Sequence, residues 1–180
     1  MTQKAVSKIV GELKQDTTIE EWLISEAFEV PFFDNCKLNF TFMNDEPGFL
    51  NESDSTLSNF FSLGKQTRLE ASELVYENCR KFLEDVGYDE ADKYLWEIKD
   101  KNKIWDFVNP TGVYVSKRSR RDCDIYIQIA CECDWEQEHG LQLVFRQGRK
   151  LTRVSSQDGH LTEADAYDKP DEQDKLLSEF

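Results

Sequence analysis

Hydrophobic and polar residues alternate with a period of two in the N-terminal part of the chain. Residues 38–42 alternate in this way, and Asp34-Asn35 separates them from an apolar stretch at 28–33. This pattern predicts two half-buried strands joined as a hairpin, with the Asp-Asn pair in the turn. Pro31 places its stretch at a sheet edge or a bulge, because proline cannot donate to a strand ladder. The apolar residues within 1–18 are compatible with either a short helix or a strand.

A helical period replaces the alternation in the middle of the chain. Between residues 69 and 86 the apolar positions recur at helical spacing, and Gly87 follows the last of them. Thr67 precedes this run with Glu70 three residues later, which is the capping-box pattern. The sequence therefore predicts a long helix that Thr67 caps and Gly87 ends.

A shorter helix is expected just before the long one. Residues 44–54 are polar and contain Pro47-Gly48, so we interpret them as a loop. Asp54 or Ser55 then has the side chain of a helix cap, and Gly64 closes the apolar run that follows.

The C-terminal half resembles a meander of strands. Alternating stretches at 112–116, 123–133, 141–145 and 151–154 are separated by turn residues, with 123–133 as the central strand. Because short connections join antiparallel neighbours, these stretches predict one antiparallel sheet.

The elements together predict an α+β fold, with an antiparallel sheet built from the N-terminal hairpin and the C-terminal meander. Two central helices pack on one face of this sheet. We expect a single domain over residues 1–161. Residues 162–180 carry seven acids and two lysines, and we expect a mobile acidic tail or a helix docked only at Leu176, Leu177 and Phe180.

Composition indicates a folded protein of a reducing compartment. Hydrophobic residues make up 39% of the 180 residues and aromatic residues 12%, which is too much apolar mass for a disordered chain. No apolar run resembles a signal peptide or approaches the ~20 residues of a membrane helix. The five cysteines are an odd number without a disulfide-like spacing, so reduced thiols and a cytoplasmic location are expected.

The net charge is the most informative global feature. With 36 acidic and 22 basic residues the chain carries a formal charge of −14, which disfavours binding to nucleic acid or to an anionic membrane. A basic protein partner would be attracted by the same field. Solubility alone is the alternative explanation. The oligomeric state stays open.

The sequence around residue 135 offers a metal-site hypothesis. Cys131 and Cys133 are two apart on an expected strand, so both thiols project from one face, and His139 with His160 could complete a tetrahedral zinc site. However, both cysteines continue an apolar stripe from Cys123, and cysteine packs well as a small hydrophobic residue. Buried thiols without a cofactor are the favoured interpretation.

The same segment also suggests acid–base catalysis. Asp134, Glu136 and Glu138 stand beside His139, but a general acid or base needs a pocket that shifts its pKa. A solvated turn, with one glutamate bonded to backbone amides and Trp135 packed on the sheet, is the favoured interpretation. No nucleophile elbow, phosphate loop or dinucleotide fingerprint is present, so no catalytic residue is assigned.

A basic turn at 117–121 raises the possibility of phosphate or RNA binding. It lacks interleaved aromatic residues, and Asp122 and Asp124 offset its charge. We interpret it as a solvated hairpin tip that discourages edge-to-edge pairing.

Several short runs resemble a bacterial family of uncharacterised domains. These runs are Ile104-Trp-Asp-Phe-Val108, Ile125-Tyr-Ile127, Cys133-Asp-Trp-Glu-Gln-Glu-His-Gly-Leu141, Phe145-Arg-Gln-Gly148 and Gln157-Asp-Gly159, together with Val30-Pro-Phe-Phe33. The resemblance covers most of residues 20–162 and is most specific around a C-x-W-E-x-E-H-G-L motif. It implies no activity, cofactor or catalytic residue. Small acidic domains of this style are similar, by analogy, to immunity proteins that neutralise toxins.

The surplus of negative charge predicts a protein-binding domain rather than an enzyme. The leading hypothesis is an immunity-type inhibitor that covers the positively charged site of a basic toxin such as a nuclease. We expect the contacts at Asp134, Trp135, Glu136 and Glu138. The alternatives are a metal-binding or hydrolytic domain at Cys131, Cys133 and His139, and a housekeeping or structural role.

Overall fold

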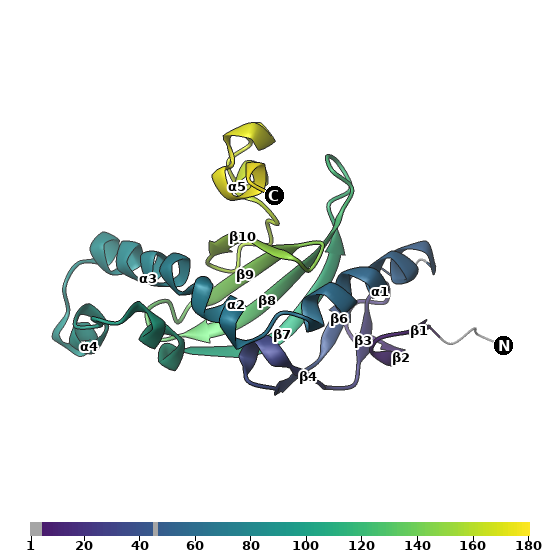
Figure 1. The fold of residues 1–180 in the computed structure, drawn as a ribbon, viewed down its shortest axis with the longest axis horizontal. Helices are drawn as coiled ribbons and strands as arrows, with labels where there is room; N and C mark the ends of the chain where they lie inside the picture. Colours follow the sequence, from purple (N-terminus) through teal and green to yellow (C-terminus); the bar gives the residue numbers. More distant parts are fainter. Residues whose placement is uncertain (1–4, 45–46) are drawn as a thin grey trace.

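The computed structural model describes residues 5–44 and 47–180 and confirms the α+β fold (Figure 1). The strands are β1 (Val6–Ser7), β2 (Gly11–Gln15), β3 (Leu23–Ser25), β4 (Phe28–Val30), β5 (Cys36–Leu38), β6 (Phe40–Phe42), β7 (Val108–Lys117), β8 (Ile125–Cys133), β9 (Leu141–Arg146) and β10 (Lys150–Ser155). The helices are α1 (Pro47–Phe61), α2 (Lys65–Glu70), α3 (Ser72–Val86), α4 (Lys93–Trp96), α5 (Glu163–Ala166) and α6 (Lys175–Ser178). Short 3-10 helices are η1 (Pro31–Phe33), η2 (Glu90–Asp92), η3 (Lys101–Phe107) and η4 (Asp171–Gln173).

Within the described ranges, eight strands form one sheet in the order β1-β2-β3-β6-β7-β8-β9-β10. The predicted C-terminal meander is confirmed, since β7, β8, β9 and β10 pair in sequence order and antiparallel. One pair departs from the expected antiparallel sheet. Strands β6 and β7 run parallel. After β6 the chain leaves the sheet, forms the elements from α1 to η3, and re-enters the sheet at the end where β6 begins.

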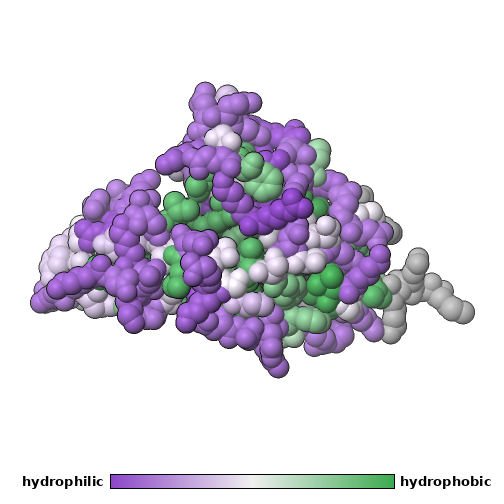
Figure 2. Space-filling view, viewed as in Figure 1, coloured by the Kyte–Doolittle hydropathy of each residue, from purple (hydrophilic) through white to green (hydrophobic). Residues whose placement is uncertain are grey.

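The central helices α1 to α3 pack on one face of this sheet, as predicted, and Figure 1 shows α1 and α2 in front of the strands. The core is rich in aromatic residues. Phe145 of β9 lies 5.9 Å from Phe60 of α1 and 5.3 Å from Phe32 of η1, measured between ring centroids. Alternate residues of β8 point into this inner core, as strand geometry requires. Figure 2 shows hydrophobic residues toward the centre of the visible face and hydrophilic residues around them.

The predicted N-terminal hairpin is present but lies outside the large sheet. Strands β4 and β5 pair with each other, and the turn residues Asp34 and Asn35 have positive φ angles of 50° and 64°. The strands on either side of the hairpin, β3 and β6, are the ones that join the large sheet. Pro31 begins η1 rather than occupying an edge strand or a bulge, since its fixed φ suits a helical first turn. Residues 6–7 and 11–15 form strands joined by a turn at 8–10; residues 1–4 lie outside the described part.

Helix α1 begins earlier than predicted. The structure starts it at Pro47, within the segment interpreted as a loop, of which residues 45–46 are not described. Asp54 lies inside the helix instead of capping it. Its carboxylate accepts hydrogen bonds from the Ser7 hydroxyl at 2.6 Å and the Lys8 amide at 3.1 Å, which ties β1 to α1.

The predicted capping box at Thr67 was wrong, because Thr67 lies within α2. The long helix α3 follows after Ala71, which joins the two helices with helical backbone angles. Gly87 ends α3 with a φ of 88°, as predicted. None of the helices in the described ranges is long and apolar enough to cross a membrane.

Residues 162–180, expected to form a mobile tail or a lightly docked helix, are folded onto the sheet; we call them the C-terminal segment. They pack on the outer face, opposite the helices, where Ala164 and Leu177 form a small cluster with Tyr126 and Val144. Asp174 is buried and accepts hydrogen bonds from the backbone amides of Ala164 and Leu177. Asp174 therefore joins α5 to α6 within the segment, while Ala164 and Leu177 make its apolar contacts with the sheet.

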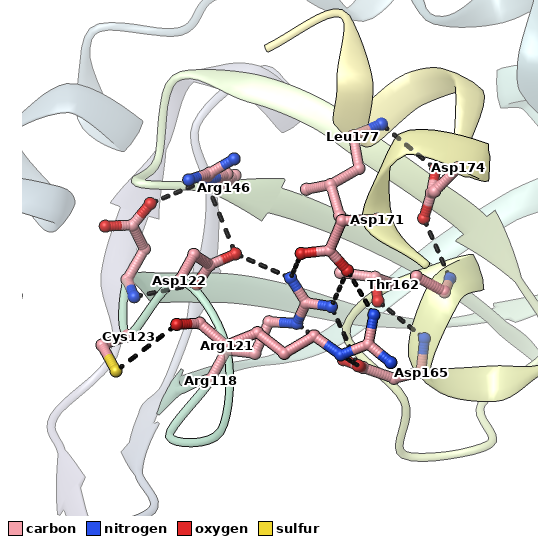
Figure 3. A network of polar contacts seen from close by, with 12 residues as sticks. Arg118, Arg121, Asp122, Cys123, Arg146, Thr162, Asp165, Asp171, Asp174 and Leu177 are labelled. Atoms are coloured by element: carbon pink, nitrogen blue, oxygen red, sulfur yellow. Dashed lines mark hydrogen bonds and ion pairs between the residues drawn. The ribbon is translucent and has the colours of Figure 1, made fainter. Parts of the chain in front are cut away.

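The basic turn after β7 is the main anchor of this segment, which corrects its interpretation as a solvated tip (Figure 3). The Arg118 side chain is only 4% exposed, and its five N–H groups donate to three aspartates. Asp165 and Asp171 come from the C-terminal segment, and Asp122 comes from the turn itself. The positive charge of Arg118, which the sequence pattern predicts to be solvated, is thus neutralised inside the molecule by Asp165 and Asp171, which lie 47 and 53 positions away in the chain.

Gly148, in the turn between β9 and β10, provides a test of the packing of α1. Its φ is 64°, and a Cβ atom there would lie 2.2 Å from the carbonyl oxygen of Thr56. We expect Gly148→Ala to lower the free energy of unfolding by about 2–4 kcal/mol through left-handed strain and overpacking. Urea denaturation measures this loss. Gly159→Ala is the matched control, since its φ is 79° with open space around the Cβ position, and only about 1–2 kcal/mol of strain is expected. Equal losses in both variants would contradict the proposed contact.

Acidification should weaken the docking of the C-terminal segment. The hydrogen bond from Arg118 lowers the pKa of Asp171 below 3.8. Burial acts to raise the pKa of Asp165, but the bonds from Arg118 and Thr162 more than offset it, so this pKa is also lowered. A lowered folded-state pKa contributes stability that is present above 3.8 and is lost as the pH falls through the folded-state values.

Urea unfolding at a series of pH values tests this directly. The difference in unfolding free energy between the wild type and Asp165→Asn/Asp171→Asn should shrink as the pH falls from about 6 to about 2. A difference that stays constant would show that the two ionised carboxylates do not stabilise the fold.

Candidate protein-binding site

An open hollow of about 690 Å³ lies where β7 begins and β8 ends. The end of η3, the first residues of β7, the last residues of β8 and the following turn surround it. The lining residues are Asp106, Phe107, Val108, Asn109, Cys131, Glu132, Cys133, Asp134, Glu136, Gln137, Glu138, His139, Gly140 and Gln157. We call this feature the acidic hollow.

The turn between β8 and β9, residues 134–140, is held by its own backbone and by Glu136. One carboxylate oxygen of Glu136 accepts hydrogen bonds from the amides of Glu138 at 3.1 Å and His139 at 3.2 Å. The Cys133 thiol donates to the Glu136 carbonyl at 3.6 Å, and the Gly140 amide donates to the same carbonyl at 3.0 Å. Glu136 therefore builds the turn, in agreement with the expectation that one glutamate bonds backbone amides.

Glycine is the only residue type that fits at position 140, the end of this turn. Its φ is 63°, and a Cβ atom would lie 2.5 Å from the carbonyl oxygen of Cys131. The Gln157 side-chain amide donates to that same oxygen at 3.0 Å, and its backbone amide donates to His139. The chain after β10 thus closes against the turn.

Trp135, one of the expected contact residues, is turned toward the interior. Its side chain is buried, and its indole N–H donates to the Asn78 side chain of α3 at 3.0 Å. The tryptophan joins the turn to the helical layer. The C-x-W-E-x-E-H-G-L motif is therefore explained to a large extent by folding, because Trp135, Glu136 and Gly140 each have a structural role.

The carboxylates that do face the hollow give it a strongly negative field. Asp134 and Glu138, both expected as contact residues, are exposed here, and Glu136 is partly exposed. Asp106 from η3 and Glu132 from β8 join them, although the sequence pattern gave no reason to select either. The lining residues include no lysine or arginine. Five carboxylates thus surround one open space, and Lys103, outside the lining, lies 3.9 Å from Asp106. The surplus of negative charge suits lysine or arginine side chains of a partner.

Tyr94 adds an exposed aromatic ring at the edge of the acidic hollow. Its hydroxyl donates to the Asp134 carboxylate at 3.1 Å, and its ring lies 5.4 Å from that of Phe107, a lining residue. The side chain is 44% exposed. Burial and the bond to Asp134 raise the pKa of Tyr94, so the phenol stays a donor at neutral pH. Sequence reasoning missed this residue because 40 positions separate it from Asp134.

Cys131 and Cys133 belong to the lining of the hollow and are buried in the core. Burial raises the pKa of the Cys131 thiol, and burial also raises that of Cys133 to about 11. Cys123 departs from the predicted apolar stripe: it precedes β8, has a φ of 60° and is exposed.

The four residues of the metal hypothesis are not brought together. His139 is exposed on the turn, and His160 is not among the lining residues; its carbonyl instead accepts from Gln142 and Arg153 on the outer face. In the described part of the chain, no group of three or more His, Cys, Asp or Glu side chains is arranged to hold a metal ion. The Nδ1 atom of His139 lies 3.6 Å from a Glu136 carboxylate oxygen, and the His139 side chain is 57% exposed.

The fold and this site define an α+β domain with a mostly antiparallel sheet and an open acidic hollow at one end of it. The chain belongs to the family described as Domain of unknown function (DUF6985), whose model matches residues 9–161. Comparison with curated proteins gives no match, and comparison with solved structures gives none either.

Thiol reactivity tests the placement of the cysteines. Cys36 and Cys123 are exposed, whereas Cys79, Cys131 and Cys133 are buried, and burial raises the pKa of Cys79 to about 12. We expect two thiols of the native protein to react with a disulfide reagent within minutes at about pH 8, and the other three to react only in denaturant. Zinc content is measured on the same sample. Stoichiometric zinc released with the slow thiols would contradict their assignment as core residues.

Proposed function

We propose that this protein is a non-enzymatic, immunity-type inhibitor that binds a basic protein, such as a nuclease toxin, through its acidic hollow. The proposed setting is the cytoplasm of a bacterium. The five cysteines, all free and three of them buried, fit a reducing compartment. Binding would act by occlusion, with carboxylates pairing with the lysines and arginines that a nuclease uses for phosphate groups.

The acidic lining of the hollow is the observation that carries this proposal. Asp106 of η3 and four carboxylates of the continuous stretch 132–138 (Glu132, Asp134, Glu136 and Glu138) converge on one open space. A net charge of −14 extends the attraction beyond the contact itself. Solubility requires only that charges be exposed, whereas here they are gathered around a concave surface.

Tyr94 gives the surface an anchor that can bury apolar area. Tyrosine is enriched among the residues that dominate binding energy, because it combines a large ring with a polar hydroxyl and few rotatable bonds. The Asp134 carboxylate and the Phe107 ring already orient it. We therefore propose Tyr94, and not Trp135, as the aromatic contact. Trp135 supports the turn through its buried contact with Asn78.

Association with the product of the adjoining toxin-like gene tests the function. An immunity gene is expected directly beside its toxin gene, so the neighbouring product is co-expressed and its binding is measured by surface plasmon resonance. The association rate should fall by about 10- to 100-fold between low and high salt. Asp134→Asn/Glu138→Gln should slow association, and Tyr94→Ala should mainly speed dissociation.

A charge-matched control separates the hollow from the overall field. Glu20→Gln/Glu21→Gln removes the same two charges at exposed positions before β3 and should leave the rates within about twofold of the wild type. Equal effects of the two double variants would show that only net charge matters. An association rate indifferent to salt, or no binding at all, would contradict the proposed function.

A further inference from the structure

The C-terminal segment is attached to the sheet mainly by polar contacts. Of its large or aliphatic side chains, Ala164 and Leu177 are the buried ones. The burial of these two side chains is a small contribution compared with the entropy of ordering the whole segment. The ion pairs with the sheet must therefore supply much of the remaining attachment.

The sheet provides a built receptor for these carboxylates. Arg118 donates two hydrogen bonds to Asp165, at 2.8 and 2.9 Å, and two to Asp171, at 2.6 and 2.9 Å. Arg121 donates to Asp171 at 2.6 Å and to the carbonyl of Lys169 at 2.8 Å. Figure 3 shows both guanidinium groups pointing at the two aspartates. Bidentate pairs of this kind select carboxylates by geometry as well as by charge.

A second buried arginine holds the start of the segment. Arg153 of β10 is 2% exposed. Its guanidinium makes a bidentate pair with Asp158 and donates to the Glu163 carboxylate at 3.3 Å. Near the chain end, the Arg146 guanidinium lies 4.4 Å from the centroid of the Phe180 ring. Basic residues of the sheet thus contact the segment along its length.

The family match includes the arginines of this site but not the C-terminal segment that they bind. The match covers residues 9–161, which include Arg118, Arg121, Arg146 and Arg153, and it stops before the C-terminal segment. The segment itself carries seven acids and two lysines. It occupies the sheet as an acidic peptide would occupy a basic groove.

Vacating this receptor would be unfavourable unless another anion took its place. Without Asp165 and Asp171, the guanidinium of Arg118 would lose four of its five hydrogen bonds to carboxylates and would keep Asp122 as its charged partner. Bidentate bonds from a guanidinium to carboxylates are strong, so another pair of carboxylates would compete for the vacated donors. Exchange of one acidic segment for another is therefore favoured over simple opening.

We propose that the outer face of the sheet around Arg118, Arg121 and Arg153 is a binding site for acidic peptide segments, which this chain fills with its own residues 162–180. An acidic segment of a partner protein, with two carboxylates able to share one guanidinium, replaces the chain's own segment in the open state. This site is separate from the acidic hollow and takes a partner of opposite charge.

The test uses the full-length chain and a labelled synthetic peptide of residues 161–180. In Asp165→Asn/Asp171→Asn, amide hydrogen exchange of residues 162–180 should become at least tenfold faster. Fluorescence anisotropy should show the peptide binding this variant at least tenfold more tightly than the wild type, whose own segment competes at a high effective concentration. A peptide with the same two substitutions should not bind.

The matched control is Asp168→Asn/Glu172→Gln, which removes two charges from exposed positions of the same segment. It should behave as the wild type in both measurements. Faster exchange without peptide binding would overturn the proposal, and so would unchanged exchange in Asp165→Asn/Asp171→Asn. Concentration-dependent dimers of the wild type, formed by exchange of segments, would overturn the assignment to a partner protein.

The wild-type chain provides a second route if the variant does not fold. Unlabelled peptide at millimolar concentration should speed hydrogen exchange in the chain's own residues 162–180, because it competes for the same arginines. The doubly substituted peptide should have no effect. Equal effects of both peptides would overturn the proposal.

Discussion

Strand β8 is buried on both faces over nearly its whole length, and the arrangement of the other layers follows from this constraint. Its inward residues, Ile125, Ile127 and Ile129, belong to the main core beneath the helices. Tyr126 points the other way and is equally buried. A strand of this kind requires cover on both sides, because its apolar side chains would otherwise remain in water. The helices supply one cover, and the C-terminal segment supplies part of the other.

The two covers are held by different forces. The helical layer packs through aromatic contacts such as Phe60 with Phe145, which bury large apolar surfaces in a dense interior. The outer layer buries little apolar surface and relies on Arg118 and Arg153, both almost fully enclosed. Polar attachment of this kind depends on pH and on competing anions, whereas the aromatic core does not. The difference makes the outer layer the part of the molecule suited to exchange.

Charge is separated along the same strand. At the end of β8 near Cys133, carboxylates gather around the acidic hollow. At the beginning of β8, near Ile125, the turn presents Arg118 and Arg121 to the C-terminal segment. A chain with a net charge of −14 therefore contains one region that attracts cations and another that binds carboxylates. The family domain of residues 9–161 contains both regions, and the segment outside it covers the second.

The sequence by itself determined the elements that local periodicity encodes. The alternation in 123–133 specified β8, and the helical spacing with Gly87 specified α3, because both patterns reflect which side of one element is buried. Within the candidate site, local chemistry predicted that one glutamate of the turn bonds backbone amides, and the structure identifies it as Glu136. Asp134 and Glu138 were selected by charge. Only the tertiary structure decided the rest. Tyr94 meets Asp134 and Arg118 meets Asp171 across long separations in the chain, and the burial of Trp135 depends on Asn78 of a distant helix. Such contacts arise from the packing of layers, and no local pattern of residues records them.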